Sequence, residues 1–95
     1  MRKQRKKIAH WTDGDSGVFT DGKRFRLANV RCPEKKQSGG SKATRTAAGM
    51  TGRSRGRVSI ETVGKSYGRT VVNMSNRDGS INERMRKRGY KTRGR

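Results

Sequence analysis

Hydrophobic and polar residues alternate in several short stretches of the chain, and this period of two predicts β-strands. The clearest stretch is residues 23–30, where Phe25, Leu27 and by extension Asn29 fall on one face and Arg26 falls on the other. The neighbouring pair Asp21-Gly22 stands between two extended stretches and predicts a hairpin. The first part of the chain is therefore expected to be a β-meander.

The same pattern predicts four further strands. They are expected at residues 8–12, 17–20, 58–62 and 67–75. Two helices are expected between and after these strands. The first, at residues 42–50, is rich in alanine and has only small apolar side chains, so it is predicted to be weak.

The second helix has a clearer start and stop. Ser80 precedes Ile81, and Glu83 stands three residues after the serine, which is the pattern of a capping box. Ile81 and Met85 share one face, and Gly89 is a suitable residue to end the helix. We therefore expect a mostly β protein of the α+β class, with five strands and two short helices.

Composition limits the size of the core and points to the partner. The 95 residues make one small domain, and only 26% of them are hydrophobic, so the core must be thin. The 26 lysines and arginines against 7 acidic residues give a formal net charge of +19, which attracts polyanions. Nucleic acid is the first partner to expect, and an anionic membrane surface is the second. Composition alone also fits a disordered basic tail or a ribosome-associated peptide.

The distribution of charge suggests the domain boundaries. Residues 1–7 carry five positive charges and predict a basic N-terminal arm, residues 8–90 form a single domain, and residues 91–95 form a basic tail. No apolar run of signal-peptide or membrane-spanning length is present, so we expect a cytoplasmic protein that does not enter a membrane. Cys32 is the only cysteine, which excludes an intramolecular disulfide and a thiol-ligated zinc site. We expect a monomer.

Three short segments carry the chemistry of phosphodiester hydrolysis. The Asp13-Gly14-Asp15-Ser16 segment is a turn whose Asp15 could ligate a divalent cation, and the strong positive charge of the chain is expected to favour the ionised carboxylates. Arg26, in Phe25-Arg26-Leu27, could clamp a phosphate through two parallel hydrogen bonds. Taken singly, these features also fit an ordinary turn and an exposed strand arginine.

The other candidate residues lie just after the third predicted strand and at the start of the fifth. Glu34, after Pro33, could orient or deprotonate an attacking water, although a loop glutamate is usually a surface residue. Arg69 could stabilise charge on the transition state, and Tyr67 offers a flat face to a base or sugar.

The joint order of these segments resembles the staphylococcal nuclease (thermonuclease) family over about residues 6–91. The resemblance implies a five-stranded OB-fold barrel and a calcium-dependent nuclease that cuts DNA and RNA. It identifies Arg26, Glu34 and Arg69 as the catalytic residues and Asp15 as a metal ligand. Tyr67 corresponds to a tyrosine near the nucleotide, and Arg31, Lys35 and Lys36 are expected to contact nucleic acid beside it.

One position departs from the family pattern. Arg31 stands where the family has its second metal-binding aspartate, while Cys32 could still offer a backbone carbonyl. Replacing a carboxylate by a guanidinium turns attraction for a cation into repulsion worth several kcal/mol at an effective dielectric constant of about 20. Substrate phosphate could complete a weak calcium site, Arg31 could replace the cation by pairing with Asp15, or catalysis could be lost.

The sequence thus predicts a nuclease for DNA or RNA whose dependence on Ca²⁺ is weakened, altered or absent. The main alternative is a catalytically inactive OB-fold protein that binds nucleic acid. A structural basic protein within a larger ribonucleoprotein or phage-like assembly is a third interpretation.

Overall fold

The computed structural model describes residues 3–34, 36–66 and 68–90. Its strands are β1 (Gln4–Asp13), β2 (Ser16–Phe19), β3 (Arg24–Leu27), β4 (Arg57–Ser66), β5 (Arg69–Asn76) and the two-residue β6 (Gly79–Ser80). Its helices are α1 (Gly40–Gly52) and α2 (Ile81–Lys87). The five main strands and both helices confirm the elements predicted from the sequence.

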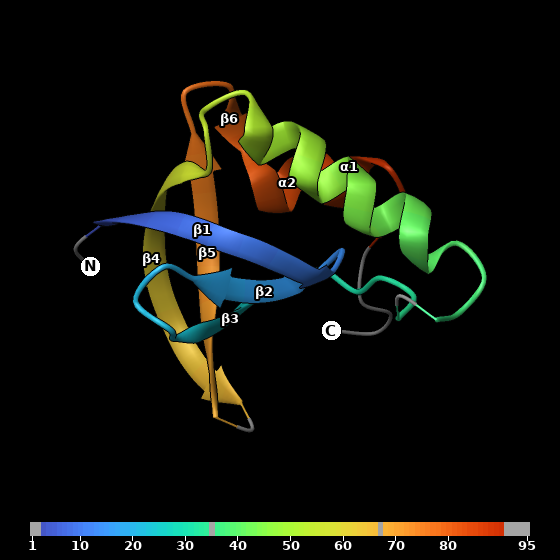
Figure 1. The fold of residues 1–95 in the computed structure, drawn as a ribbon, viewed down its shortest axis with the longest axis horizontal. Coiled ribbons are helices and arrows are strands. Elements are labelled where there is room, and N and C mark those ends of the chain that lie inside the picture. The colour runs from blue at the N-terminus through green and yellow to red at the C-terminus, as the bar shows by residue number, and fades with distance from the viewer. Residues whose placement is uncertain (1–2, 35, 67, 91–95) are drawn as a thin grey trace.

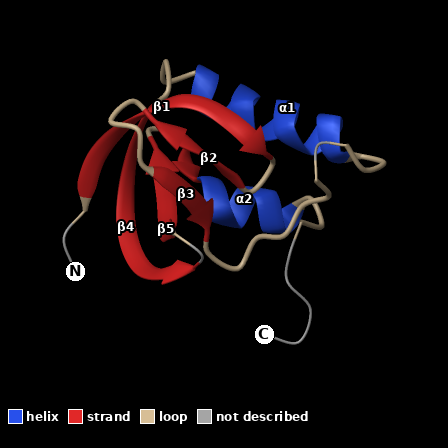
Figure 2. Ribbon diagram, turned by 60° about the horizontal axis from the view of Figure 1, so that its bottom comes forward, coloured by secondary structure: helices blue, strands red, loops and turns tan. Residues whose placement is uncertain are grey.

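The strands close on themselves. They are hydrogen-bonded in the order β3-β2-β1-β4-β5-β6, and an additional parallel pairing joins β3 to β5. The five main strands therefore form a ring, with α1 inserted between β3 and β4 (Figure 1). The two helices lie together on one side of the strands, where α1 contacts β1 and α2 contacts β5 (Figure 2).

The core fills the inside of this ring and the space beneath the helices. Phe25 is fully buried, stacks on Phe19 with ring centroids 4.5 Å apart, and meets the edge of Trp11 at 5.1 Å. The indole N–H of Trp11 donates to Thr51 Oγ1 at 3.0 Å, which ties β1 to the end of α1. Small alanines on α1 allow that helix to approach closely, as Ala43 and Ala47 are both fully buried.

Helix α2 begins and ends as its local sequence predicts. The Ser80 side chain accepts a hydrogen bond from the Glu83 amide at 3.2 Å, which is the expected cap. At the other end Gly89 has φ 96°, and the amide of Tyr90 donates to the carbonyl of Met85 at 3.2 Å. This pairing is a Schellman motif, and it returns the chain to the core.

Two boundaries were predicted wrongly. Strand β1 begins at Gln4, so residues 4–7 of the predicted basic arm are part of the sheet and pair with β4, with Gln4 opposite Ile60. Strand β3 ends at Leu27, and Asn29 is an exposed residue with φ 58° instead of a strand residue on the core face. Residues 91–95, the predicted tail, lie outside the described residues.

Candidate functional site

The turn between β1 and β2 is packed against the segment that follows β3. A Cβ atom at Gly14 would lie 2.8 Å from both Cys32 Sγ and Ala43 Cβ, so only glycine fits here without displacement. The carbonyl of Asp15 accepts a hydrogen bond from the Leu27 amide at 2.8 Å. Backbone packing therefore fixes the position of Asp15 relative to the end of β3.

The Asp15 carboxyl is buried, with 9% of its residue surface exposed. Its Oδ2 accepts the backbone N–H of Cys32 at 3.4 Å. Burial raises the pKa of Asp15 above its usual value, and the Cys32 amide and the charge of Arg26 only partly oppose this. The prediction that the positive charge of the chain favours the ionised carboxylate is therefore wrong for Asp15. Local desolvation of its carboxyl outweighs the attraction of distant positive charges, because solvent screens those charges.

Arg26 and Arg69 lie on the same outward face of the parallel pair β3–β5. Arg26 pairs in register with Val71, and Arg69 precedes Val71 by two residues, so all three point to one side of the sheet. Phe25 and Leu27 point to the other side and are buried, whereas Arg26 is half-buried. The structure therefore brings the two predicted arginines together on one surface, and it places Arg26 close enough to Asp15 to act on the pKa of that carboxyl.

The segment after β3 carries Arg31, Glu34 and Lys36, all of them exposed. The backbone N–H of Glu34 donates to Gln37 Oε1 at 2.9 Å. Among the described residues, no hydrogen bond or ion pair joins Arg31 or Glu34 to Asp15. The ion pair of Arg31 with Asp15 that one sequence interpretation required is thus not formed, and Arg26 is the cation that acts on Asp15. Lys35 and Tyr67 lie outside the described residues.

The side chains around Asp15 are poorly suited to hold the calcium ion that the resemblance implies. Ca²⁺ takes six to eight oxygen ligands, usually with more than one carboxylate. Within the described part of the chain, no group of three acidic, histidine or cysteine side chains gathers that could hold a metal ion. The Asp15 carboxylate, which the resemblance implies as a metal ligand, already accepts the Cys32 amide.

Asp13 and Cys32, which the sequence analysis named without making them site residues, both lie near Asp15. The negative charge of Asp13 raises the pKa of Asp15, so the two carboxyls lie close together, and the Asp13 side chain accepts a hydrogen bond from Ser16 Oγ at 3.3 Å. Burial, with the nearby charges of Asp15 and Asp13, raises the pKa of Cys32 to about 12. The thiol therefore stays protonated at neutral pH and is not a nucleophile.

Arg24 and Lys65 were also missed. They line a hollow of about 490 Å³ together with Arg69, at the tips of the β2–β3 and β4–β5 hairpins. A Cβ atom at Gly68 would lie 3.9 Å from Nη2 of Arg24, so this guanidinium reaches the neighbouring hairpin. The sequence pattern of β3 places Arg24 on the same face as Arg26, and Arg24 could have been identified from this alternation.

Neither of the helices within the described residues is long and apolar enough to cross a membrane. No curated protein matches the chain. The family model for staphylococcal nuclease homologues matches residues 24–93, which include β3, α1, β4, β5 and α2. The ring of five strands, with a helix between the third and the fourth, agrees with the OB-fold that this match implies. The chain belongs to the family of staphylococcal nuclease homologues.

Proposed function

We propose that this protein is a nuclease that hydrolyses phosphodiester bonds of DNA or RNA, with a weakened or altered dependence on Ca²⁺. The family acts on nucleic acids and is in general calcium-dependent. The observation that carries the proposal is the shared outward face of Arg26 and Arg69 on β3 and β5. Two guanidinium groups on one surface suit a phosphate that gains negative charge during attack.

In this proposal, Arg26 binds the phosphate in a bidentate manner and Arg69 stabilises the leaving sugar oxygen. Water forms a new P–O bond in line with the P–O bond that breaks. Glu34 orients this water and accepts its proton. Its side chain is accessible to the water because it is exposed after β3. Asp15 lies beside Arg26 and holds that guanidinium in place through their mutual attraction.

Tyr67, Lys35, Lys36 and Arg31 are proposed to contact the nucleic-acid strand around the bond that is cut. Of these, Lys36 and Arg31 are exposed after β3. Their positive charges favour binding of the phosphate backbone regardless of sequence.

The test is a cleavage assay on fluorescent single-stranded DNA, titrated with calcium and with chelator. We expect cleavage that falls at least 100-fold in Glu34→Gln and in Arg69→Ala, because single electrostatic or proton-transfer contacts contribute about that much. Lys42→Gln, an exposed charge on α1, is the control and should retain the activity of the parent. Absence of cleavage in every metal, or unchanged rates in both variants, excludes the proposal.

The second candidate function is binding of nucleic acid without catalysis. The observation that favours it is the exposed Arg31, because the resemblance to the family implies a second metal-binding aspartate at this position. This alternative predicts salt-dependent binding with no turnover, and it gains support if Arg31→Asp creates calcium-dependent cleavage in an inert parent.

A further inference from the structure

A basic hollow lies on another part of the molecule. It has a volume of about 1130 Å³ and is lined by five arginines and two lysines against a single aspartate. Its walls come from the start of β1, the β2–β3 turn, the α1–β4 loop at residues 53–56, the start of β4, and the end of β5 with the turn that follows it. We call this hollow the arginine groove.

The loop of the arginine groove is held in one conformation. Ser54 Oγ lies 2.7 Å from the Arg57 carbonyl and 3.1 Å from the Thr51 carbonyl, within hydrogen-bond distance of both. The side chain of Asn76, the last residue of β5, donates to the carbonyl of Met50 at 2.9 Å. The carbonyl of Gly56 accepts the Ile8 amide of β1 at 2.8 Å. The loop is thereby fastened to both neighbouring strands.

Arg55 adopts an unfavourable backbone conformation within this loop. Its φ is 57°, in the left-handed region that an arginine occupies only at an energetic cost. Gly56 follows with φ 78°, and a Cβ atom there would lie 3.1 Å from the Ile8 carbonyl. The glycine is required by the close approach to β1, whereas nothing in the backbone requires an arginine beside it. Strain held by a rigid surrounding is often connected with function.

The charges of the arginine groove are only partly neutralised. Lys6 pairs with Asp21 at 2.7 Å, and Arg53 pairs with Asp78 at 3.1 Å. Arg77 donates to the carbonyl of Arg53 at 3.1 Å. No ion pair involves the other four cations of the groove within the described part of the chain, and these are Arg5, Lys7, Arg55 and Arg57.

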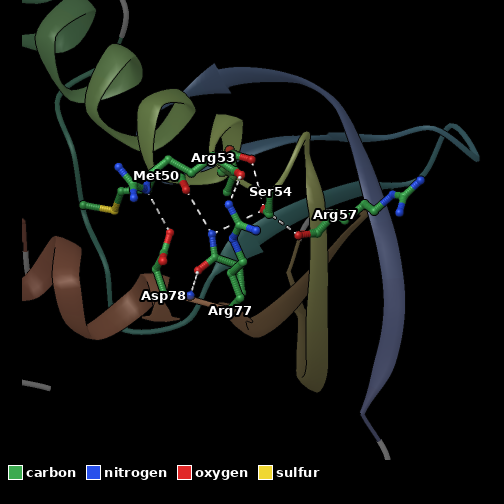
Figure 3. Close-up of polar contacts among 8 residues, drawn as sticks. Met50, Arg53, Ser54, Arg57, Arg77 and Asp78 are labelled. Atoms are coloured by element: carbon green, nitrogen blue, oxygen red, sulfur yellow. Dashed lines mark hydrogen bonds and ion pairs between the residues drawn. The ribbon is translucent and has the colours of Figure 1, made fainter.

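These four side chains are exposed. Figure 3 shows that Arg57 extends away from the hydrogen-bonded network while its backbone is held in that network. Like charges at this density repel one another and lower the stability of the fold, unless a polyanion neutralises them. Guanidinium groups on a fixed backbone suit phosphate oxygens, which they bind through paired hydrogen bonds.

The arginine groove is connected to the candidate site. Lys6 lines both this groove and the smaller hollow that contains Arg69. Strand β5 runs from Arg69 to Asn76, and Arg77 of the groove follows at its far end. The eight steps from Arg69 to Arg77 span at most about 26 Å at ~3.3 Å per residue.

We propose that the arginine groove is a second binding site for the phosphate backbone of a nucleic-acid strand, which it holds at a distance from the bond that is cut. The strand would pass from the groove over Lys6 to the surface of Arg69. This inference rests on the proposed function for the choice of nucleic acid as the ligand, but it does not require that the protein cleaves.

The test compares Arg55→Gln/Arg57→Gln with Lys42→Gln/Arg45→Gln. Both pairs remove two exposed positive charges, but Lys42 and Arg45 line neither hollow. Binding of fluorescent single-stranded DNA is measured by anisotropy in chelator, with strands of 4 and 30 nucleotides. The short strand covers only about 14 Å at ~3.4 Å per nucleotide, whereas the long strand reaches both sites.

We expect the groove variant to bind the long strand at least tenfold more weakly than the control variant. The gain in affinity on lengthening the strand should shrink, and the slope of log affinity against log salt should fall by about 1.4 for the two lost contacts. Arg55→Gly provides a second variant, because it removes the charge while it relieves the backbone strain, so that misfolding cannot explain its loss of binding.

Equal binding by the groove and control variants overturns the proposal. So does a loss of binding to anionic phospholipid vesicles with unchanged binding to DNA, which would assign the groove to a membrane surface. Whether the parent protein cleaves DNA is measured separately from these DNA-binding and vesicle-binding experiments. A protein that never cleaves, yet loses long-strand affinity in the groove variant, would exclude the nuclease and retain the groove.

Discussion

The backbone N–H of Cys32 donates a hydrogen bond to Oδ2 of Asp15, and the two atoms are 3.4 Å apart. This distance is at the long end of the range for hydrogen bonds, so the bond compensates little of the carboxylate's desolvation. Burial of the carboxyl raises the pKa of Asp15, and the Cys32 amide and the charge of Arg26 offset only part of that rise. The candidate site thus holds an acidic group that ionises less readily in the folded protein than in the unfolded chain.

Asp15→Asn should therefore raise the free energy of unfolding at pH 7. Because the folded-state pKa is raised, the protonated carboxyl stabilises the fold below the unfolded pKa of about 3.9, and this contribution is lost as the pH rises through the folded pKa. The advantage of the variant should shrink as the pH falls to about 3.5. Urea unfolding at the two pH values measures it.

Asp21→Asn is the matched control with the opposite sign. A hydrogen bond from Lys6 lowers the pKa of Asp21, so its carboxylate stabilises the fold above the unfolded pKa, and this stability is lost as the pH falls through the folded pKa. Asp21→Asn should lower stability at pH 7. If both variants shift stability in the same direction at pH 7, desolvation of Asp15 is not the cause.

Arg31→Asp should create a calcium site. The substitution replaces an exposed cation with a carboxylate, next to Cys32, whose backbone N–H contacts Asp15. We expect the affinity for Ca²⁺ in isothermal titration to rise at least tenfold over the parent, because a carboxylate near a divalent ion is worth several kcal/mol. Lys36→Asp makes the same change of charge in the same segment, and an equal rise there would contradict a defined site.

Asn82→Leu should destabilise the protein by about 2–4 kcal/mol. The Asn82 side chain is buried, accepts the Met74 amide at 2.8 Å, and donates to the carbonyls of Ala28 and Val72 at 2.9 and 3.1 Å. Leucine keeps a similar volume but removes the acceptor of the Met74 amide and one of the two donors to each carbonyl, since Val72 still accepts the Ala28 amide and Ala28 still accepts Arg86. Guanidinium unfolding measures the loss. A change below 1 kcal/mol would show that water replaces the lost bonds.

Gly14→Ala should cost about 1–3 kcal/mol, the range for an overpacked interior position. The new methyl group would press on Cys32 Sγ and Ala43 Cβ, each 2.8 Å away. Adding Cys32→Ala to this variant should recover part of the loss, because it removes the sulfur atom. A double-mutant cycle on thermal unfolding tests the coupling, and strictly additive effects would argue against the contact.

The elements that could be predicted from the sequence are those that depend on local signals. The start of α2 needs only Ser80 and Glu83, and the hairpin before β3 needs only Asp21 and Gly22. The start of β1 at Gln4 could not be predicted, since residues 4–7 are polar and become a strand only through pairing with β4.

Some features of the candidate site could likewise be predicted from local sequence, and others could not. The strand alternation correctly placed Arg26 opposite the core face, whereas the raised pKa of Asp15 depends on burial that only the folded chain creates. The arginine groove was not predicted because its walls come from segments far apart in the sequence, such as Arg5, Arg55 and Arg77. The roles of Glu34 and Arg69 remain predictions.

The parallel pairing of β3 with β5 has a consequence for how the candidate site forms. Phe25 and Thr70, which are partners in this pairing, are far apart in the sequence, and closure of so long a loop is a slow step in folding. Arg26 and Arg69 share a surface only once that step is complete. During synthesis, the chain therefore cannot present its paired arginines until β5 has left the ribosome, and any C-terminal truncation that removes β5 should abolish the site as well as the fold.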